Sequence, residues 1–248
     1  ALEYECMLMA ALGARCSIGD QMHPAGFLEE EAYHAVRRGY RAVEAAEEYL
    51  RGARQVADVA ILSVESSNPP NAGSFNRDNI SDDGAARVLL ELHIPFVVID
   101  SAADFSRFRL LILPDEVHVS GEMAERLNKY IEAGGKLLLT GGSGMNREET
   151  EFLIDLGLEY SGEMGAFSPD YIRPVSGLDR DLPKAPFVVY ERPYKVRKGG
   201  GESWAESYEP YFNRRWDHFC SHQHTPYKPE PAKELDPVVT FPWGAYVC

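Results

Sequence analysis

The sequence predicts an α/β protein built on a parallel, doubly wound sheet. The apolar run at 58–64 is short and continuous, which is typical of a strand buried on both faces, and further strands are expected over 109–115 and 136–140. Helical patterns are expected between them, over 85–93 and 121–135, so strands and helices alternate in short steps. This alternation places successive strands in parallel with helices on both faces of the sheet.

The N-terminal region predicts a separate α/β step. Residues 1–13 indicate a helix, and "ARCSIGDQMHPAGF" (14–27) indicates a short strand that ends in a loop. A strong amphipathic helix follows over 29–53, with Gly52 as its stop. One helical face carries Tyr33, Val36, Tyr40, Val43 and Leu50. One such step cannot bury both faces of its strand, so further elements are expected to pack against it.

The remaining segments complete the predicted order of elements. A strand is expected over 95–100 and a further helix over 147–158. After about residue 161, prolines, aromatics and glycines become more frequent, and strands are expected over 186–191 and 237–247. The polar loop 65–84 lies at the carboxyl edge of the sheet, and Asp78, Asp82 and Asp83 lead from it to a helix cap. The loop has no phosphate-binding glycine motif, and an interface role is the alternative for it.

Charge and cysteine content exclude several classes of function. Lys and Arg number 25 against 39 Asp and Glu, a formal net charge of −14, which disfavours nucleic acid and anionic membranes as partners. The four cysteines form no CxxC pair, so neither a zinc framework nor a disulfide scaffold is expected. Reduced thiols are favoured, with two bridges left open. No cofactor and no metal are expected.

Residues 84–142 resemble a known family. "LLELHIPFVVID", "DFSRF", "LLILPD" and "YIEAGGKLLLTGG" occur in the order found in the β-galactosidase trimerisation domain. This is the class I glutamine-amidotransferase-like module that follows the catalytic barrel in family 42 glycoside hydrolases. The resemblance covers roughly residues 56–160. It implies a flavodoxin-like or amidotransferase-like sheet over 54–160.

The resemblance also implies the nature of the two segments that flank residues 54–160. Residues 1–53 look like the last strand and helices of a (β/α)₈ barrel, and 161–248 like an irregular α+β extension. The tail "FNRRWDHFCSHQHTP" is similar to the ends of fucosidase-like and galactosidase-like barrel hydrolases. Because the sequence starts at Ala1 and ends on the apolar "TFPWGAYVC", a piece of a longer polypeptide is expected.

The implied function is that of a largely non-catalytic assembly domain of a glycoside hydrolase. The implied partners are a carbohydrate substrate of the intact protein and further copies of the chain. Two alternatives remain open: a self-contained amidotransferase-like hydrolase, and a stand-alone sugar-binding module. Localisation is undetermined, with the cytoplasm favoured.

Ser143 is the first candidate for chemistry. It follows the strand at 136–140 in "TGGSGM", where amidotransferase-like folds carry a cysteine nucleophile on a tight turn. No cysteine is present there, and Met145 breaks the Gly-x-Ser-x-Gly pattern. A serine nucleophile also needs a histidine base, for which His118 is the candidate. The simpler interpretation is a solvated turn that closes the sheet.

Asp20, Gln21 and His23 form the second candidate site. If "ARCSI" is the last barrel strand, these residues stand at its C-terminal end, where barrel active sites are built. Asp20 is then the candidate catalytic acid, and all three are candidates for binding sugar hydroxyls. The alternative is a loop acid beside a capping histidine.

The tail supplies the third candidate site. His222, His224 and Trp216 are candidates for substrate binding, because imidazoles bind hydroxyls and indoles stack on sugar rings. The stretch "DHFCSHQH" also suggests a metal site, but its spacing matches no zinc pattern. The alternative for Trp204, Trp216 and Trp243 is a role in the core or an interface.

Overall fold

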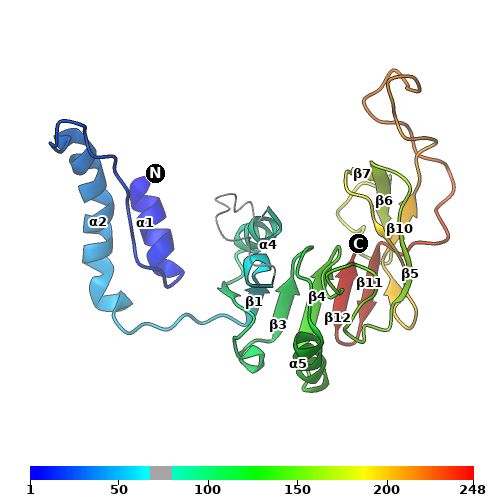
Figure 1. Ribbon diagram of the computed structural model, residues 1–248, viewed down its shortest axis with the longest axis horizontal. Coiled ribbons are helices and arrows are strands. Elements are labelled where there is room, and N and C mark those ends of the chain that lie inside the picture. The colour runs from blue at the N-terminus through cyan, green and yellow to red at the C-terminus, as the bar shows by residue number, and fades with distance from the viewer. Residues whose placement is uncertain (68–79) are drawn as a thin grey trace. The chain divides into compact units, whose positions relative to one another are not determined.

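The computed structural model describes residues 1–67 and 80–248, so Asp78 and most of the predicted polar loop lie outside the described residues. The chain divides into two compact units, Ala1–Ala57 and Asp58–Cys248 (Figure 1). The first unit consists of two helices, α1 (Leu2–Ala11) and α2 (Glu30–Leu50).

The two helices of the first unit confirm the predictions made for 1–13 and 29–53. They pack closely at Gly39, where an added Cβ would lie 3.0 Å from the Cys6 sulfur. The strand expected within 14–27 is wrong, because residues 12–29 connect the helices as turns and extended chain and residues 1–57 contain no strand. A strand needs a neighbour to accept its backbone hydrogen bonds, and this unit offers none.

The second unit is built around a seven-stranded sheet in the order β2-β1-β3-β4-β12-β11-β9. Strands β1 to β4 and β12 pair in parallel, and β11 and β9 add antiparallel pairs at one end. The strands are β1 (Val59–Leu62), β2 (Phe96–Ile99), β3 (Leu110–Leu113), β4 (Lys136–Thr140), β9 (Glu202–Ser203), β11 (Val238–Phe241) and β12 (Gly244–Val247). The helices are α3 (Val64–Ser67), α4 (Ile80–Glu91), η1 (Phe105–Arg107) and α5 (Gly121–Glu132).

Helices cover both faces of this sheet. Leu111 and Leu113 of β3 point into the larger core, together with Leu127 of α5. Ile112 lies between them in the sequence and points to the opposite face, where it joins a smaller core with Leu89 of α4. Successive side chains of a strand alternate in this way, so strands buried on both faces are apolar at every position. The predicted α/β class with a mainly parallel central sheet is confirmed.

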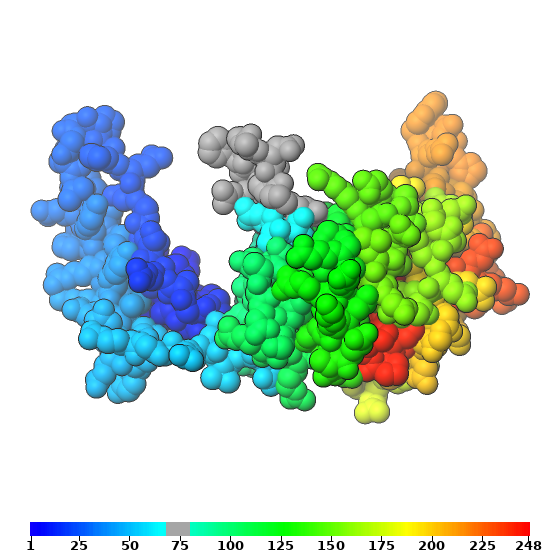
Figure 2. Space-filling model, turned by 60° about the horizontal axis from the view of Figure 1, so that its bottom comes forward, coloured from blue at the N-terminus to red at the C-terminus, as the bar shows by residue number. Residues whose placement is uncertain are grey.

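The end of the chain returns to the middle of the sheet. The hairpin of β11 and β12 confirms the strands expected over 237–247, and β12 pairs in parallel with β4. In the space-filling view the last strands, in red, lie directly beside the green surface formed by β4 and α5 (Figure 2). The sheet is therefore assembled from segments about a hundred residues apart in the sequence.

The helix expected over 147–158 is wrong. Residues 146–158 form turns, and Glu149 has a φ of 55°, which an α-helix does not allow. Asn146 holds the turn, since its side-chain oxygen accepts from the Thr150 N–H at 2.9 Å. After these turns, Ile154 and Leu156 are buried and the residue between them is exposed, so this later part of the segment is extended and not helical.

Residues 159–248 form strands and no helix. A three-stranded antiparallel sheet contains β6 (Asp170–Pro174), β7 (Phe187–Val189) and β10 (Ala205–Tyr208). A two-stranded pair contains β5 (Glu159–Met164) and β8 (Tyr194–Arg197). The strand expected over 186–191 is β7.

Asp170 makes the stability of this region depend on pH. Its carboxylate is buried, and although it accepts from the Tyr171 N–H at 2.9 Å and the Ser207 hydroxyl at 3.3 Å, burial raises its pKa from 3.8 to about 6. The folded protein therefore binds more protons than the unfolded chain between about pH 4 and pH 6. The contribution of the protonated Asp170 to the free energy of unfolding is complete below pH 4. About 2 kcal/mol of it is lost as the pH rises through 6.

Urea unfolding from about pH 4 to pH 7 measures this contribution. We expect Asp170→Asn to remove it, so that the variant gains stability relative to the wild type as the pH rises. Other carboxylates titrate in both proteins, and the difference between the two curves isolates Asp170. Parallel curves would contradict the assignment.

Candidate functional site

The turn after β4 is the first place where chemistry was expected. Gly141 and Gly144 have positive φ values of 53° and 83°, which let the chain reverse immediately after Thr140. The Ser143 side chain is completely buried, and its Oγ accepts from the Thr140 N–H at 3.0 Å. The expected solvated turn is therefore wrong, because Ser143 points into its own turn.

Side chains from later in the chain close over this turn. A Cβ added to Gly142 would lie 2.7 Å from the Tyr194 hydroxyl and 3.2 Å from Glu149 Oε1. Glu149 Oε1 lies 2.9 Å from His118 Nε2, so His118, the expected base, is paired with a carboxylate. Burial, and then the hydrogen bond with Glu149, raise the pKa of Tyr194. The arrangement stabilises the end of β4 and does not present Ser143 to a substrate.

Asp82 belongs to the same edge of the sheet. The sequence predicted a helix cap for it, but its carboxylate bridges to the end of β1. It accepts from the Val64 N–H at 3.0 Å and from the Ser63 hydroxyl at 3.1 Å, while it lies in the first turn of α4. Asp82 therefore links α4 to the turn after β1.

Asp20, Gln21 and His23 are exposed in the connection between α1 and α2. The His23 ring stacks on Phe27 with ring centroids 4.1 Å apart, and its Nδ1 accepts from the Ala25 N–H at 3.1 Å. These contacts form a local turn around the imidazole. The first unit supplies no strand end to carry the three side chains, and their role remains a prediction.

The third candidate site lies on a projecting segment, residues 209–228, which we call the arm. Its two ends are tied together by Tyr211 N–H to Pro226 O at 3.1 Å and Lys228 N–H to Glu209 O at 2.8 Å. Figures 1 and 2 show the arm, in orange, standing clear of the strands. The backbone of Arg215 pairs with that of His218 near its tip.

The arm exposes an unusual amount of aromatic surface. Trp216 is 90% exposed and Phe219 is 66% exposed. His222 is exposed, whereas His224 is half-buried with its Nε2 3.2 Å from the Tyr190 hydroxyl. Within the described part of the chain, no group of three or more His, Cys, Asp or Glu side chains is placed to hold a metal ion. Tyr190, which precedes the arm in sequence, was not predicted, because no local pattern connects it to His224.

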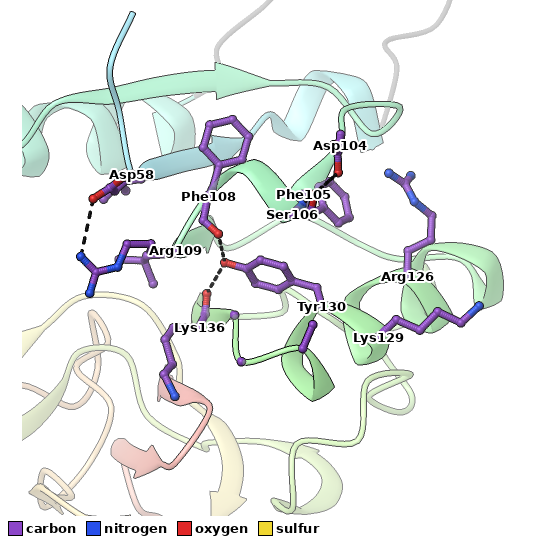
Figure 3. A pocket seen from close by; sticks show the side chains of 15 residues that line it. Asp58, Asp104, Phe105, Ser106, Phe108, Arg109, Arg126, Lys129, Tyr130 and Lys136 are labelled. Carbon is purple, nitrogen blue, oxygen red and sulfur yellow. Dashed lines mark hydrogen bonds and ion pairs between the residues drawn. The ribbon is translucent and has the colours of Figure 1, made fainter.

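A cavity of about 1050 Å³ lies at the opposite, amino edge of the sheet (Figure 3). Its wall contains Tyr130, whose hydroxyl lies 3.2 Å from Phe108 O and 3.3 Å from Lys136 O. Arg126 donates to the carbonyls of Ser101 and Ala103 and lies over the Phe105 ring. These polar groups are used by the fold, and doubly wound sheets bind ligands at the other edge.

One end of the sheet carries an exposed apolar surface, which we call the α4–β2 face. It consists of Val88 and Leu92, one helical turn apart, and of Val98 on the edge strand β2. Their exposed fractions are 57%, 62% and 56%. The sequence did not predict this surface, because "PFVVID" indicates a strand but not that the strand lies at the edge of the sheet. Large apolar side chains exposed in this way are candidates for a contact with another molecule.

No helix among the described residues is long and apolar enough to span a membrane.

Comparison with known proteins finds a family match for the central part of the chain. Residues 87–164 match the family model described as the β-galactosidase trimerisation domain. The chain is 28% identical over 198 residues to the β-galactosidase BglY of Alicyclobacillus acidocaldarius, covering 74% of this chain and 27% of that protein.

Solved structures give the same result. The α-L-fucosidase isoenzyme 2 of Paenibacillus thiaminolyticus has a TM-score of 0.86 and 36% identity, over 100% of this chain and 37% of that one. The β-galactosidase of Rahnella sp. R3 has a TM-score of 0.65 and 18% identity, over 99% of this chain and 38% of that one, and shows the fold alone. The chain thus spans well under half the length of these relatives. Within it, residues 87–164 match the β-galactosidase trimerisation domain, a non-catalytic assembly domain of galactosidase-like and fucosidase-like glycoside hydrolases.

Proposed function

We propose that this chain is the assembly region of a glycoside hydrolase that acts on a galactoside or fucoside as a homo-oligomer. The family match supports the assembly role, and the named activities of the two most relevant relatives support the substrate class. The closed turn around Ser143 supports placing the catalytic carboxylates elsewhere in the whole protein. This argues against the alternative of a self-contained hydrolase working at that turn.

We also propose the finer assignments of fold. The order β2-β1-β3-β4 with β12 in fifth place matches the flavodoxin-like 2-1-3-4-5 arrangement. Residues 1–53 are proposed as the end of a (β/α)₈ barrel, 54–160 as the trimerisation domain and 161–248 as its extension. In this proposal Asp20, Gln21 and His23 border the mouth of the barrel, where their exposed side chains bind sugar hydroxyls.

The α4–β2 face is our proposed subunit contact. In a twofold dimer the same patch of both copies meets, whereas in a ring of three or more copies a patch on each copy meets a different patch on the next. Apolar side chains more than half exposed at an unpaired strand edge are costly in water and are covered favourably by a second copy. This exposed apolar face is the observation that supports the proposal.

Light scattering coupled to gel filtration of the full-length enzyme tests this contact. We expect Val98→Asp to convert the oligomer to a smaller species and to weaken association at least about tenfold, because a carboxylate would be buried without a partner. Leu182→Asp, at a comparably exposed apolar residue far along the chain, is the control and should leave the mass unchanged. An unchanged mass for Val98→Asp would refute the α4–β2 face as the contact.

A second proposal concerns the arm. Trp216, His222 and His224 are proposed to contact the carbohydrate in the assembled enzyme, because a bare indole on a projecting segment is suited to stack on a sugar ring. The alternative of a stand-alone sugar-binding module rests on the same arm, and it would bind sugar without hydrolysing it.

Kinetics of the full-length enzyme on aryl galactosides and fucosides test the role of the arm. We expect Trp216→Ala to lower kcat/KM about tenfold at unchanged oligomer mass. Tyr211→Ala, at the base of the same arm, should keep wild-type kinetics. Unchanged kinetics with a reduced mass would instead make the arm a subunit contact and contradict the proposal.

A further inference from the structure

Two cysteines of the first unit meet at the contact between its helices. Cys6 lies in α1, is completely buried and faces Gly39 of α2. Glycine is required at this point for close packing, because an added Cβ would lie 3.0 Å from the Cys6 sulfur and 3.3 Å from Leu2 O. The thiol is therefore held at a tight contact between two backbones.

The chain after α1 folds back so that Cys16 reaches Cys6. The Ala14 N–H donates to Met9 O at 2.8 Å, which reverses the chain at the end of the helix. The Cys16 thiol then donates to the Cys6 carbonyl at 3.0 Å, and the Tyr40 hydroxyl lies 3.4 Å from Cys16 O. Burial, and then the neighbouring Cys16 thiol, raise the pKa of Cys6. The Cys16 thiol thus lies against the residue that carries the Cys6 thiol, and both cysteines are free.

We propose that Cys6 and Cys16 are a redox-active pair that a small-molecule disulfide such as oxidised glutathione converts to an intrachain disulfide. Cys16 is only half-buried and reacts first, whereas Cys6 is inaccessible to a bulky reagent. The Cys16 thiolate attacks one sulfur of the small disulfide, forming a mixed disulfide and releasing one small thiol. The Cys6 thiolate then attacks the Cys16 sulfur and releases the second. Two protein thiols are oxidised, and one small disulfide is reduced to two thiols.

The bridge would act on the segment that carries the exposed polar residues. Cys16 stands four residues before Asp20, and a covalent bond to α1 fixes the start of the connection at residues 17–28. Oxidation therefore restricts the motion of Asp20, Gln21 and His23 relative to α1, with no change in the second unit.

Peptide mapping of the purified protein tests the pair. Trypsin cleaves after Arg15, so Cys6 and Cys16 fall on different peptides that only a disulfide can join. After incubation with oxidised glutathione, we expect the intact mass to fall by two hydrogen atoms, two of the four thiols to become inert to alkylation, and the two peptides to be linked. Hydrogen exchange in residues 17–28 should slow.

Two variants make the result decisive. Cys16→Ser, checked for unchanged helix content by circular dichroism, should prevent the mass loss, whereas Cys220→Ser should not affect it. A stable glutathione adduct on Cys16 without linkage to Cys6, or four thiols that still react with the alkylating reagent, would overturn the proposal.

Discussion

Replacing Gly244 with alanine is expected to destabilise the second unit by about 4 kcal/mol. Gly244 begins β12 with a φ of 150°, directly opposite Leu137 of β4. A Cβ there would overlap the Leu137 carbonyl group and also lie 2.9 Å from its nitrogen. These are backbone atoms of a central strand, so the clash is relieved only if β12 moves away. That movement exposes Tyr246, whose side chain is completely buried and whose hydroxyl donates to Gly141 O at 2.8 Å.

Urea unfolding monitored by circular dichroism measures this loss, and Gly200→Ala serves as the control. Gly200 lies in a turn with no atom within 4 Å of an added Cβ, so its replacement should change stability by about 0.5 kcal/mol or less. The same unfolding midpoint for Gly244→Ala and the wild type would mean that β12 does not lie against β4 as described.

The second large effect is expected at Gly135, one of the residues that line the cavity beside Tyr130. An added Cβ would lie 2.3–2.5 Å from three carbons of the Tyr130 ring, which is buried and packs edge-to-face against Phe105. The ring cannot turn aside without losing the contacts of its hydroxyl with the carbonyls of Phe108 and Lys136. We therefore expect Gly135→Ala to cost about 3 kcal/mol in the free energy of unfolding.

A double-mutant cycle separates this clash from any general effect on the backbone. In a Tyr130→Ala background the ring is absent, so Gly135→Ala should cost much less than it does in the wild type. Gly121→Ala is the control, since nothing lies within 4 Å of a Cβ at that position of α5. Equal costs of Gly135→Ala in both backgrounds would show that Tyr130 is not the obstacle.

Local sequence patterns predicted the elements whose residues are fixed by their nearest neighbours. The apolar runs around β1, β3 and β4 are continuous because both faces of those strands are covered, and α5 has a regular apolar face ending at Gly134. The family resemblance rested on these same elements. Fold class and assembly role could therefore be predicted before any contact was known.

Patterns failed where a partner distant in the sequence decides the structure. "ARCSI" is apolar enough for a strand, but the first unit contains no second strand to pair with it. The segment 147–158 has helical composition, yet the Asn146 turn and the left-handed Glu149 make it extended. Ser143 looked like an exposed residue of a turn, but its side chain is completely buried, and Tyr194, about fifty residues later in the chain, lies against the neighbouring Gly142.

The sequence by itself determined the α/β class and the parallel strands, because apolar periodicity is a local property of each segment. The assembly role of the central region followed from the resemblance of its motifs to a known family. Only the tertiary structure decided that the last strand enters the sheet beside β4, that Val98 remains exposed on an edge, and that Cys16 folds back onto Cys6. Each of these depends on contacts between residues separated along the chain, which are fixed only when the surrounding elements pack together.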